Sequence, residues 1–422
     1  MTVVPGGTGA TPLREAANGL FEQTLFPLVK NAIERRATTA VEGSFGSLPS
    51  FIACAGAELT HAGGCVLLVV AHLDEADDAI EELRSLGVEA LPFPAIEVLP
   101  GETSPSADLT VARLAVVRRL AEGSPPRVIV APIAALMQSV PEPKRMASLV
   151  RDIVPGARIS PTELVGWLVE GGYRRVESIE SPGEVAVRGG IIDICPPGGT
   201  TPIRLDFFGD EVERIFEIDI ATQASDRKID KVELIAVALD AVLGDAKTGA
   251  GAQSFAECLP MGTVTVLAEM SEIIEQARAY WDRVRDGRGV YGPPATLSAI
   301  ANRSVATLEL HAFGSAGGAA QRLGARAVPV FSEDAANSAG EVAALAQGRV
   351  AVIVCESDGE RARMAELLAM HIQVGTVALA IGHLARGFLL DAEQRSFLLV
   401  PASEVLHRPP VRRRGRTLAG GR

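Results

Sequence analysis

The chain has 422 residues, too many for one ordinary hydrophobic core, so we expect about two to four domains. It carries 52 acidic and 40 basic residues, a net charge of −12, which argues against binding nucleic acid by overall charge and leaves only a local basic patch open. The five cysteines are scattered and no stretch reaches 18 apolar residues, so we expect a cytoplasmic protein without disulfides, signal peptide or membrane span.

Residues 1–20 are expected to form a flexible leader. After them, alternating strand and helix patterns predict a parallel α/β layer domain made of two segments, 21–145 and 227–305. The clearest elements are a strand over Cys65–Ala71, a helix over Leu73–Leu86, a helix over Ala107–Ala121 and a strand over Arg127–Ala131.

The segment Gly43–Ser50 lies where an α/β NTPase would carry its phosphate-binding loop. Gly43 and Gly46 could match glycines of that loop. Pro49, however, stands where the lysine should be, and proline supplies neither a positive charge nor a backbone N–H. We therefore expect a degenerate, P-loop-like turn that binds no nucleotide and no other cofactor.

The stretch 146–226 has a different character and is expected to form a small α+β domain inserted into the first one. A helix start at Ser160–Glu163 precedes three extended segments, Glu184–Cys195, Pro202–Phe208 and Glu211–Asp219. Gly189 and Gly190 predict a bulge or kink directly after Arg188. These patterns together predict an antiparallel meander.

A third unit, a small α/β domain, is expected over 306–405, with a strand at Arg349–Cys355 and a helix at Gly359–Ala369. Residues 406–422 are rich in arginine, proline and glycine and are expected to form an unordered tail. The six histidines show no metal-ligand spacing, and no catalytic motif stands out, so nothing in the residues requires an enzyme or a metal.

The inserted domain offers the sharpest local signal for function. Between Arg151 and Asp226 there are seven arginines and fourteen carboxylates, so the net charge is seven minus fourteen, or −7. A small sheet that displays a few arginines in an acidic field suits protein recognition better than DNA binding. The alternative is that Arg175 and Arg188 only pair with neighbouring carboxylates, and the residues alone do not decide between the two.

The same residues resemble a known family. The string GGYRRVESIESPGEVAVRGGIIDICPPG, the motif DFFGDE and the later Thr222-Gln-x-Ser225 look like the UvrB-interaction (UvrA-binding) domain of bacterial transcription-repair coupling factors. The upstream motif EVLPGE at Glu97–Glu102, the pair Arg113-Leu114 and Leu259-Pro260 are similar to the same family. The resemblance extends over about residues 20–410, more weakly after residue 300.

The resemblance implies that this meander binds UvrA. Arginines hold UvrA in the UvrB relatives, and the positions that match are Arg175 and Arg188, with Tyr173 and Glu184 expected beside them in the contact. Those relatives carry a further arginine where this chain has Ala186, so one contact should be lost or weaker.

The resemblance also implies a role. The full family continues into a polymerase-binding domain and an ATP-dependent motor that acts on double-stranded DNA, and we expect neither in this chain. We therefore expect a monomeric, non-catalytic adaptor that binds UvrA in nucleotide excision repair. The alternative is a nucleotide-binding or DNA-stimulated ATPase module, and a weaker one is DNA binding through the Arg-rich tail.

Overall fold

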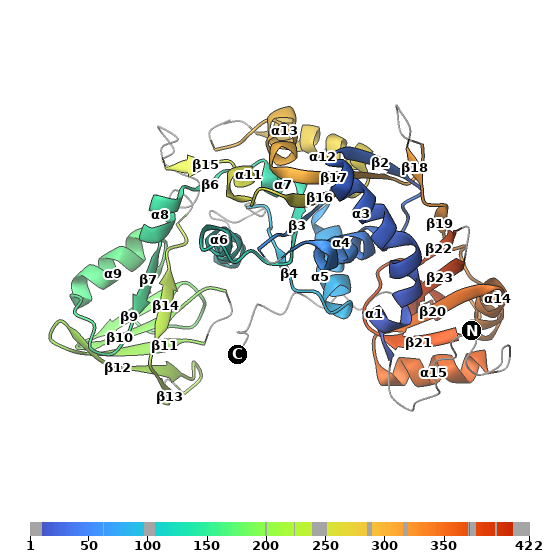
Figure 1. The fold of residues 1–422 in the computed structure, drawn as a ribbon. Coiled ribbons are helices and arrows are strands. Elements are labelled where there is room, and N and C mark those ends of the chain that lie inside the picture. The colour runs from blue at the N-terminus through green and yellow to red at the C-terminus, as the bar shows by residue number, and fades with distance from the viewer. Residues whose placement is uncertain are drawn as a thin grey trace.

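The computed structural model describes residues 11–61, 63–96, 106–198, 201–222, 224–238, 251–284, 289–314, 320–369, 371, 377–392 and 395–407. The fold is mixed α/β, as the sequence predicts, with three sheets of six or seven strands at its centre and two ends (Figure 1). The motif at Glu97–Glu102 and the Arg-rich tail from residue 408 lie outside the described residues. No helix in the described part of the chain is long and apolar enough to cross a bilayer.

The central unit is a sheet of seven parallel strands in the order β18-β2-β17-β16-β3-β5-β4. Its inner strands β3, β5 and β16 are buried along their whole length, as expected for a sheet that is covered on both faces. The strands are β2 (Thr38–Glu42), β3 (Val66–Val70), β4 (Ala90–Pro92), β5 (Val128–Pro132), β16 (Thr263–Leu267), β17 (Ser304–His311) and β18 (Gln321–Arg322). The helices around it are α3 (Phe26–Arg35), α4 (Leu48–Leu59), α5 (Leu73–Ser85), α6 (Ala107–Ala121), α7 (Ile133–Leu136), α11 (Phe255–Cys258), α12 (Met270–Arg283) and α13 (Pro293–Arg303).

The third unit is a six-stranded sheet in the order β1-β21-β20-β23-β22-β19. One hydrophobic core runs between this sheet and the central one, because Phe388 and Phe397 belong to the same buried cluster as Phe51 of α4. The two units are therefore packed as one body. The elements are β1 (Thr11–Pro12), β19 (Ala325–Ala327), β20 (Arg349–Cys355), β21 (Val377–Ile381), β22 (Phe388–Asp391), β23 (Ser396–Pro401), α14 (Ala335–Ala346), α15 (Asp358–Leu368) and α16 (Ala402–Val405).

Two expectations about this part of the chain are wrong. The described end of the expected leader is ordered: β1 pairs with β21, and Leu13 of α1 (Leu13–Ala16) and Leu20 of α2 (Asn18–Leu20) are fully buried. A π-helix, η1 (Phe21–Leu25), follows directly. The expected boundary between residues 305 and 306 falls inside β17, which pairs with β16 and β2 of the central sheet. In both cases the structure depends on pairing with a strand that is distant in the sequence. The local sequence pattern carries no information about such pairing.

The inserted unit is a six-stranded sheet in the order β13-β12-β11-β10-β9-β8, covered on one face by α9 (Pro161–Glu170). All its neighbours are antiparallel except β8 and β9. The strands are β8 (Arg174–Val176), β9 (Glu184–Arg188), β10 (Ile191–Cys195), β11 (Ile203–Phe208), β12 (Glu211–Ile218) and β13 (Ser225–Ile229). The connection to the central unit runs through β6 (Val140–Pro141), α8 (Pro143–Ser148), β7 (Val150–Ile153), β14 (Val232–Ile235) and β15 (Ala252–Gln253).

The structure corrects the expected meander at two places. Glu184–Cys195 is not one kinked strand but the hairpin β9–β10, because Gly189 takes a positive φ of 61° and reverses the chain there. The expected boundary between residues 226 and 227 falls inside β13, whose polar sequence Ser225–Ile229 resembles a loop but pairs with β12.

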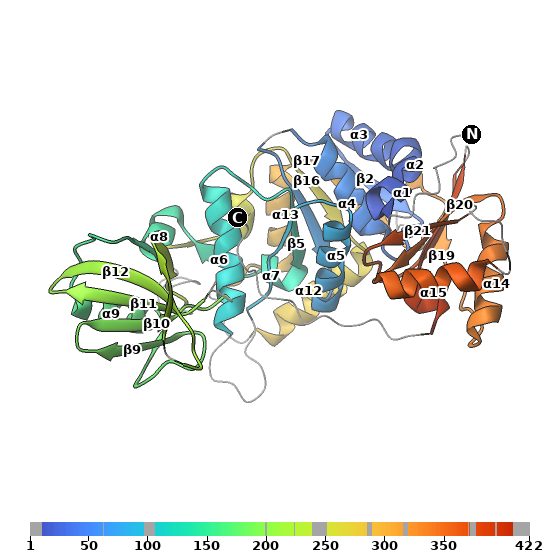
Figure 2. The same ribbon diagram turned by 90° about the horizontal axis from the view of Figure 1, so that it is seen from below.

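A buried arginine holds helix α6 against the central unit, on the side where the insertion is attached. The side chain of Arg113 on α6 is fully buried and its guanidinium donates to the carbonyls of Pro94 (2.8 Å), Ala135 (3.1 Å) and Ser139 (3.2 Å). It also stacks on Phe93, 4.1 Å from the ring centre. Burial lowers the pKa of Arg113 to about 9, so the group is still a cation at neutral pH and depends on these carbonyls. It thereby holds α6 in the position where Figure 2 shows it, between the central sheet and the inserted unit.

Candidate functional site

The degenerate loop occupies the position of a phosphate-binding loop. It follows β2, which ends at Glu42, and leads into α4, which begins at Leu48. Gly43 and Gly46 adopt positive φ angles of 78° and 56°, which glycine tolerates best. Pro49 lies in the first turn of α4. The backbone thus forms a strand–loop–helix turn. Whether such a turn can bind phosphate depends on free N–H donors and positive charge.

The backbone N–H groups of this loop are largely used by the protein itself. Gly43 and Ser44 both donate to the carbonyl of His311, over 2.9 and 3.0 Å. Ser47 donates its N–H to the carbonyl of Arg386 over 3.1 Å, while its hydroxyl donates to the same carbonyl and accepts the N–H of Arg386. Pro49 has no N–H to offer. A phosphate would find few of the free donors that make such a loop a binding site.

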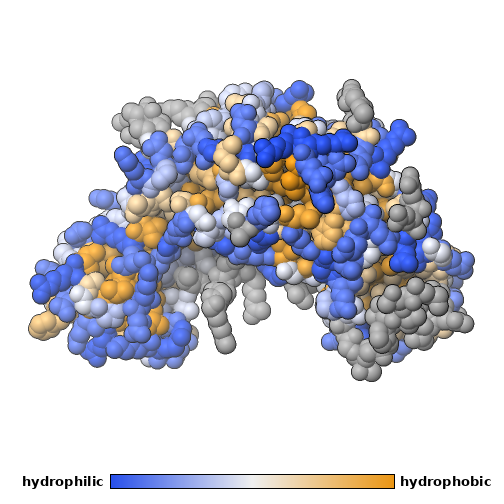
Figure 3. Space-filling model, viewed as in Figure 1, coloured by the Kyte–Doolittle hydropathy of each residue, from blue (hydrophilic) through white to orange (hydrophobic). Residues whose placement is uncertain are grey.

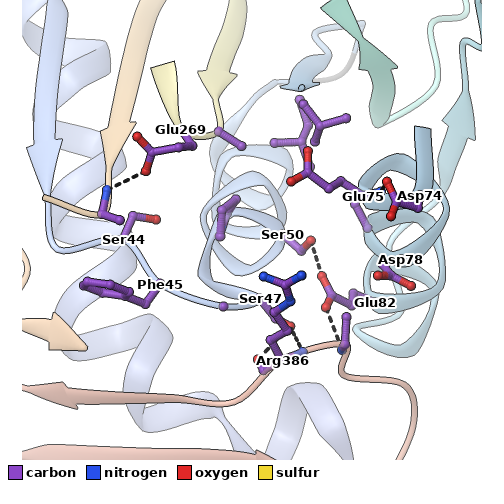
Figure 4. A pocket seen from close by; sticks show the side chains of 18 of the residues that line it. Ser44, Phe45, Ser47, Ser50, Asp74, Glu75, Asp78, Glu82, Glu269 and Arg386 are labelled. Carbon is purple, nitrogen blue, oxygen red and sulfur yellow. Dashed lines mark hydrogen bonds between the residues drawn. The ribbon is translucent and has the colours of Figure 1, made fainter. Parts of the chain in front are cut away.

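The cavity beside the loop has the wrong charge for a nucleotide. It measures about 260 Å³ and lies at the carboxyl ends of β3 and β16. Arg386 extends into it from the third unit, and carboxylates surround it on the α5 and α12 sides (Figure 4). Burial and neighbouring carboxylates raise the pKa of Glu272, as expected where negative charges crowd. The acidic residues that line the cavity are Asp74, Glu75, Asp78, Glu82, Glu269 and Glu272.

The same place joins the central and third units. Glu82 is buried on α5, where it accepts hydrogen bonds from the Ser50 hydroxyl and from the N–H of Ala385 (3.0 Å). Gly46 packs so closely that an added Cβ would lie 2.6 Å from the carbonyl oxygen of Gly387. We call these two facing segments, residues 43–50 and 382–387, the joint.

A histidine adds charge to the joint. The ring of His383 lies 3.1 Å from a carboxylate oxygen of Glu356 and 3.6 Å from one of Asp78. Asp78 above all, with Glu356 and Glu82, raises the pKa of His383 to about 9 against the opposing effect of burial. The imidazolium therefore links α5 to the third unit at neutral pH.

The four residues expected to bind UvrA do not lie together on one surface. Arg175 and Arg188 are exposed, and the side chain of Arg175 makes no hydrogen bond or ion pair to any described residue. Tyr173 is only 3% exposed and packs in the core beneath α9, where no partner can reach it. Glu184 is 4% exposed. Placing Tyr173 and Glu184 in a contact surface was therefore wrong.

Glu184 instead organises the loop that supports Arg188. Its carboxylate pairs with Arg174 and accepts the N–H groups of Glu180 (2.6 Å) and Ser181 (2.9 Å). Although burial opposes the effect, these donors lower the pKa of Glu184. The guanidinium of Arg188 donates to the carbonyl of Glu177 in the same loop, at 3.3 Å from both nitrogens.

The register of β8 assigns a different arginine to the face that carries Arg188. Arg174 pairs with Glu184 and Arg175 with Val185, whose side chain lies in the core beneath α9. Alternation along β9 then places Arg174 and Arg188 on the face away from α9, and Arg175 on the other. We call the face away from α9 the outer face. The signal was present in the sequence, because Arg174 is the direct neighbour of the apolar Tyr173 and must point the opposite way.

Most arginines of the outer face are neutralised by carboxylates. Arg204 makes two hydrogen bonds to the buried Asp193, at 2.7 and 2.8 Å, and Asp193 raises the pKa of Arg204. Arg214 lies 3.9 Å from Asp206. Arg188 differs, because its guanidinium donates to the neutral carbonyl of Glu177. Figure 3 shows hydrophilic and hydrophobic residues interspersed over the visible face of this unit.

Comparison with known proteins defines the inserted unit. Residues 152–238 match the family model of the UvrB interaction domain. In the described residues, no group of three or more His, Cys, Asp or Glu is placed to hold a metal ion.

A larger part of the chain is similar to transcription-repair-coupling factors, and the resemblance expected from the sequence is confirmed. The chain is 33% identical to the Mycobacterium tuberculosis protein over 56% of its own length, and 34% identical to the Bacillus subtilis protein over 38%. With the Escherichia coli protein it shares 34% identity over 33% of its length. These matches cover 19%, 14% and 12% of the three relatives, so the matched region corresponds to a fifth of their length or less.

The close packing of the joint leads to a prediction for Gly46→Ala. The new Cβ would collide with the backbone of Gly387 and Arg386 and would also strain a φ of +56°, so we expect the free energy of unfolding to fall by about 3 kcal/mol or more. Gly87→Ala is the matched control, because Gly87 has a φ of +77° with open space around it and should lose only about 1–2 kcal/mol. Urea titration measures both, and equal losses would show that residues 43–50 are not tightly packed against 382–387.

The raised pKa of His383 predicts a pH dependence. The folded pKa of about 9 lies above the ordinary 6.5, so the stabilisation is complete below pH 6.5 and is lost as the pH rises through 9. We expect unfolding free energy to fall by about 1–3 kcal/mol over that window, and His383→Gln to remove most of the fall. Urea titrations at several pH values measure this fall. If the unfolding free energy of the variant falls with pH as much as that of the unaltered chain, His383 is not the cause.

Proposed function

We propose that this chain is a cytoplasmic, non-catalytic adaptor that binds UvrA through the outer face of its inserted sheet. It would thereby connect nucleotide excision repair to transcription. The observation that carries the proposal is the exposed Arg188, which is held by the Glu177 carbonyl and lies inside the segment that matches the UvrB interaction domain. Arg174, anchored by Glu184 on the same face, is proposed as a second contact in place of Arg175.

Charge supports a protein partner over nucleic acid. The inserted segment has a net charge of −7, so a phosphate backbone would be repelled, whereas a single arginine on an ordered sheet can pair with a carboxylate of a protein surface. RNA polymerase and double-stranded DNA remain proposed partners of the longer relatives, through regions that this chain does not match.

The proposal predicts that Arg188→Ala weakens binding to purified UvrA at least tenfold, because the arginine should pair with a carboxylate at the contact. Arg174→Ala should weaken it less, since Arg174 already pairs with Glu184. Arg175→Ala should have no effect by itself if the assignment to the outer face is right. Titration by interferometry or calorimetry measures all three.

The matched control is Arg322→Ala, whose side chain is 85% exposed and lies on the edge strand of the central sheet. Its affinity for UvrA should equal that of the unaltered chain. If Arg188→Ala binds UvrA as tightly as this control does, the site on the outer face is refuted.

The alternative function, a nucleotide-binding or DNA-stimulated ATPase module, gains no support from the loop. Its N–H groups bond to His311 and Arg386, Pro49 replaces the lysine, and carboxylates line the cavity. We expect no ATP turnover by the purified chain, with or without DNA. Turnover that survives Ser47→Ala and Arg386→Ala would belong to a contaminant, whereas turnover abolished by them would establish the ATPase alternative.

A further inference from the structure

The cavity at the joint has the position and the size of a ligand site. It lies at the carboxyl ends of the parallel strands β3 and β16, which is where open α/β sheets bind their ligands. Its volume of about 260 Å³ is far above the space of about 10–15 Å³ that one water molecule needs. Residues of the central and third units line it together, and they include both apolar and charged side chains. Because the loop offers few donors for phosphate, the ligand that fits must be of another class.

An unpaired hydroxyl group lies at this cavity. Ser44 is only 8% exposed, and its Oγ has no hydrogen-bond partner in the described part of the chain. The N–H of Ser44 donates to His311, and the carboxylate of Glu269 accepts the N–H of the next residue, Ala312, over 2.7 Å. The hydroxyl and this carboxylate are therefore neighbours on the cavity wall, and Figure 4 shows the hydroxyl turned inward. Since a buried hydroxyl without a partner is unfavourable, this group points to a ligand that supplies one.

The charge of the cavity favours a cation. Six carboxylates line it, and Arg386 is the only lysine or arginine among the described residues that do so. Glu272, at the start of α12, makes no hydrogen bond or ion pair to a described residue. Burial, together with the carboxylates of Glu75 and Glu269, raises its pKa. A positively charged group placed among these three side chains would relieve their mutual repulsion.

The spread of the carboxylates favours an extended cation over a metal ion. Figure 4 shows Glu269 on one side of the cavity and carboxylates of α5, Asp74 among them, on the other. Nowhere in the described residues do three or more His, Cys, Asp or Glu converge as a metal ion requires. Leu68, Val70 and Ala268, from the ends of β3 and β16, add apolar surface to the wall. A methylene chain with an ammonium group at each end matches this pattern of charge and apolar surface.

We propose that this cavity binds a linear aliphatic diamine in its doubly charged form. One ammonium group pairs with Glu269 and Glu272 and donates a hydrogen bond to the Ser44 hydroxyl. The other pairs with the carboxylates of α5, including that of Asp74, and the methylene chain lies on the apolar wall. Because both units line the cavity, the bound diamine stabilises the packing of the central unit against the third. This site is separate from the proposed UvrA contact and goes beyond the proposed function.

The test is a calorimetric titration of the intact chain with 1,4-diaminobutane at neutral pH and fixed ionic strength. We expect one site with a Kd of about 1 mM or below, and binding of butylamine about tenfold weaker, because it carries a single ammonium group. Glu272→Gln and Ser44→Ala should each weaken binding of the diamine by about fivefold or more. The matched control is Glu275→Gln, because Glu275 is exposed on the next turn of α12 and does not line the cavity. Its affinity should not change.

Several results would overturn the proposal. One is that no binding is detected at about ten times the expected Kd. Others are equal affinities for butylamine and diaminobutane, or equal effects of Glu272→Gln and Glu275→Gln, because either indicates unspecific attraction to an acidic protein. Displacement of the diamine by magnesium ions at the same ionic strength would assign the cavity to a metal instead.

Two further measurements keep the test decisive. Thermal melts establish that the variants are folded, and if Ser44→Ala is not, Glu272→Gln decides. Arg188→Ala should bind the diamine as the unaltered chain does, so failure of the UvrA contact and failure of this site are told apart.

Discussion

The backbone hydrogen bonds of residues 43–50 decide what the central unit can do. In a nucleotide-binding fold the N–H groups after the first strand are left free for phosphate. Here those of Gly43 and Ser44 go to His311 and that of Ser47 goes to Arg386 of the third unit. The donors that would have held a ligand instead hold the protein together, and the central and third sheets share one core behind them. A strand–loop–helix turn has thus become a structural joint.

That rigid body supports a sheet of a different kind. The inserted unit is joined to it through short strands beside α6, and the buried cation of Arg113 ties α6 to the carbonyls around it. On the outer face of the inserted sheet, carboxylates pair with Arg174, Arg204 and Arg214. Arg188 pairs only with a neutral carbonyl and is therefore the arginine best placed to bind an acidic partner. This arrangement suits a protein surface, because one accessible arginine can pair with one carboxylate of a partner.

The sequence predicted the elements whose signals are local. The expected helix Ala107–Ala121 has the same bounds in the structure, because apolar residues recur on one face and Gly123 follows its end. Gly43, Gly46 and Pro49 predict a degenerate loop at this place, and the structure has a strand–loop–helix turn there. Local signals do not predict long-range pairing. Two examples are the pairing of β17 with the central sheet and the hydrogen bond between Ser47 and a residue 339 positions away. For the candidate site, the burial of Tyr173 and Glu184 depends on the folded sheet, and the register of β8 places Arg175 on the opposite face from Arg188.

The most direct test of the account is hydrogen exchange of the intact chain with and without purified UvrA. We predict slower exchange in β8–β10, around Arg188, with no change in residues 43–50 on the far side of α6. Protection confined to the central or third unit, or no protection at all, would contradict the assignment of UvrA binding to the outer face.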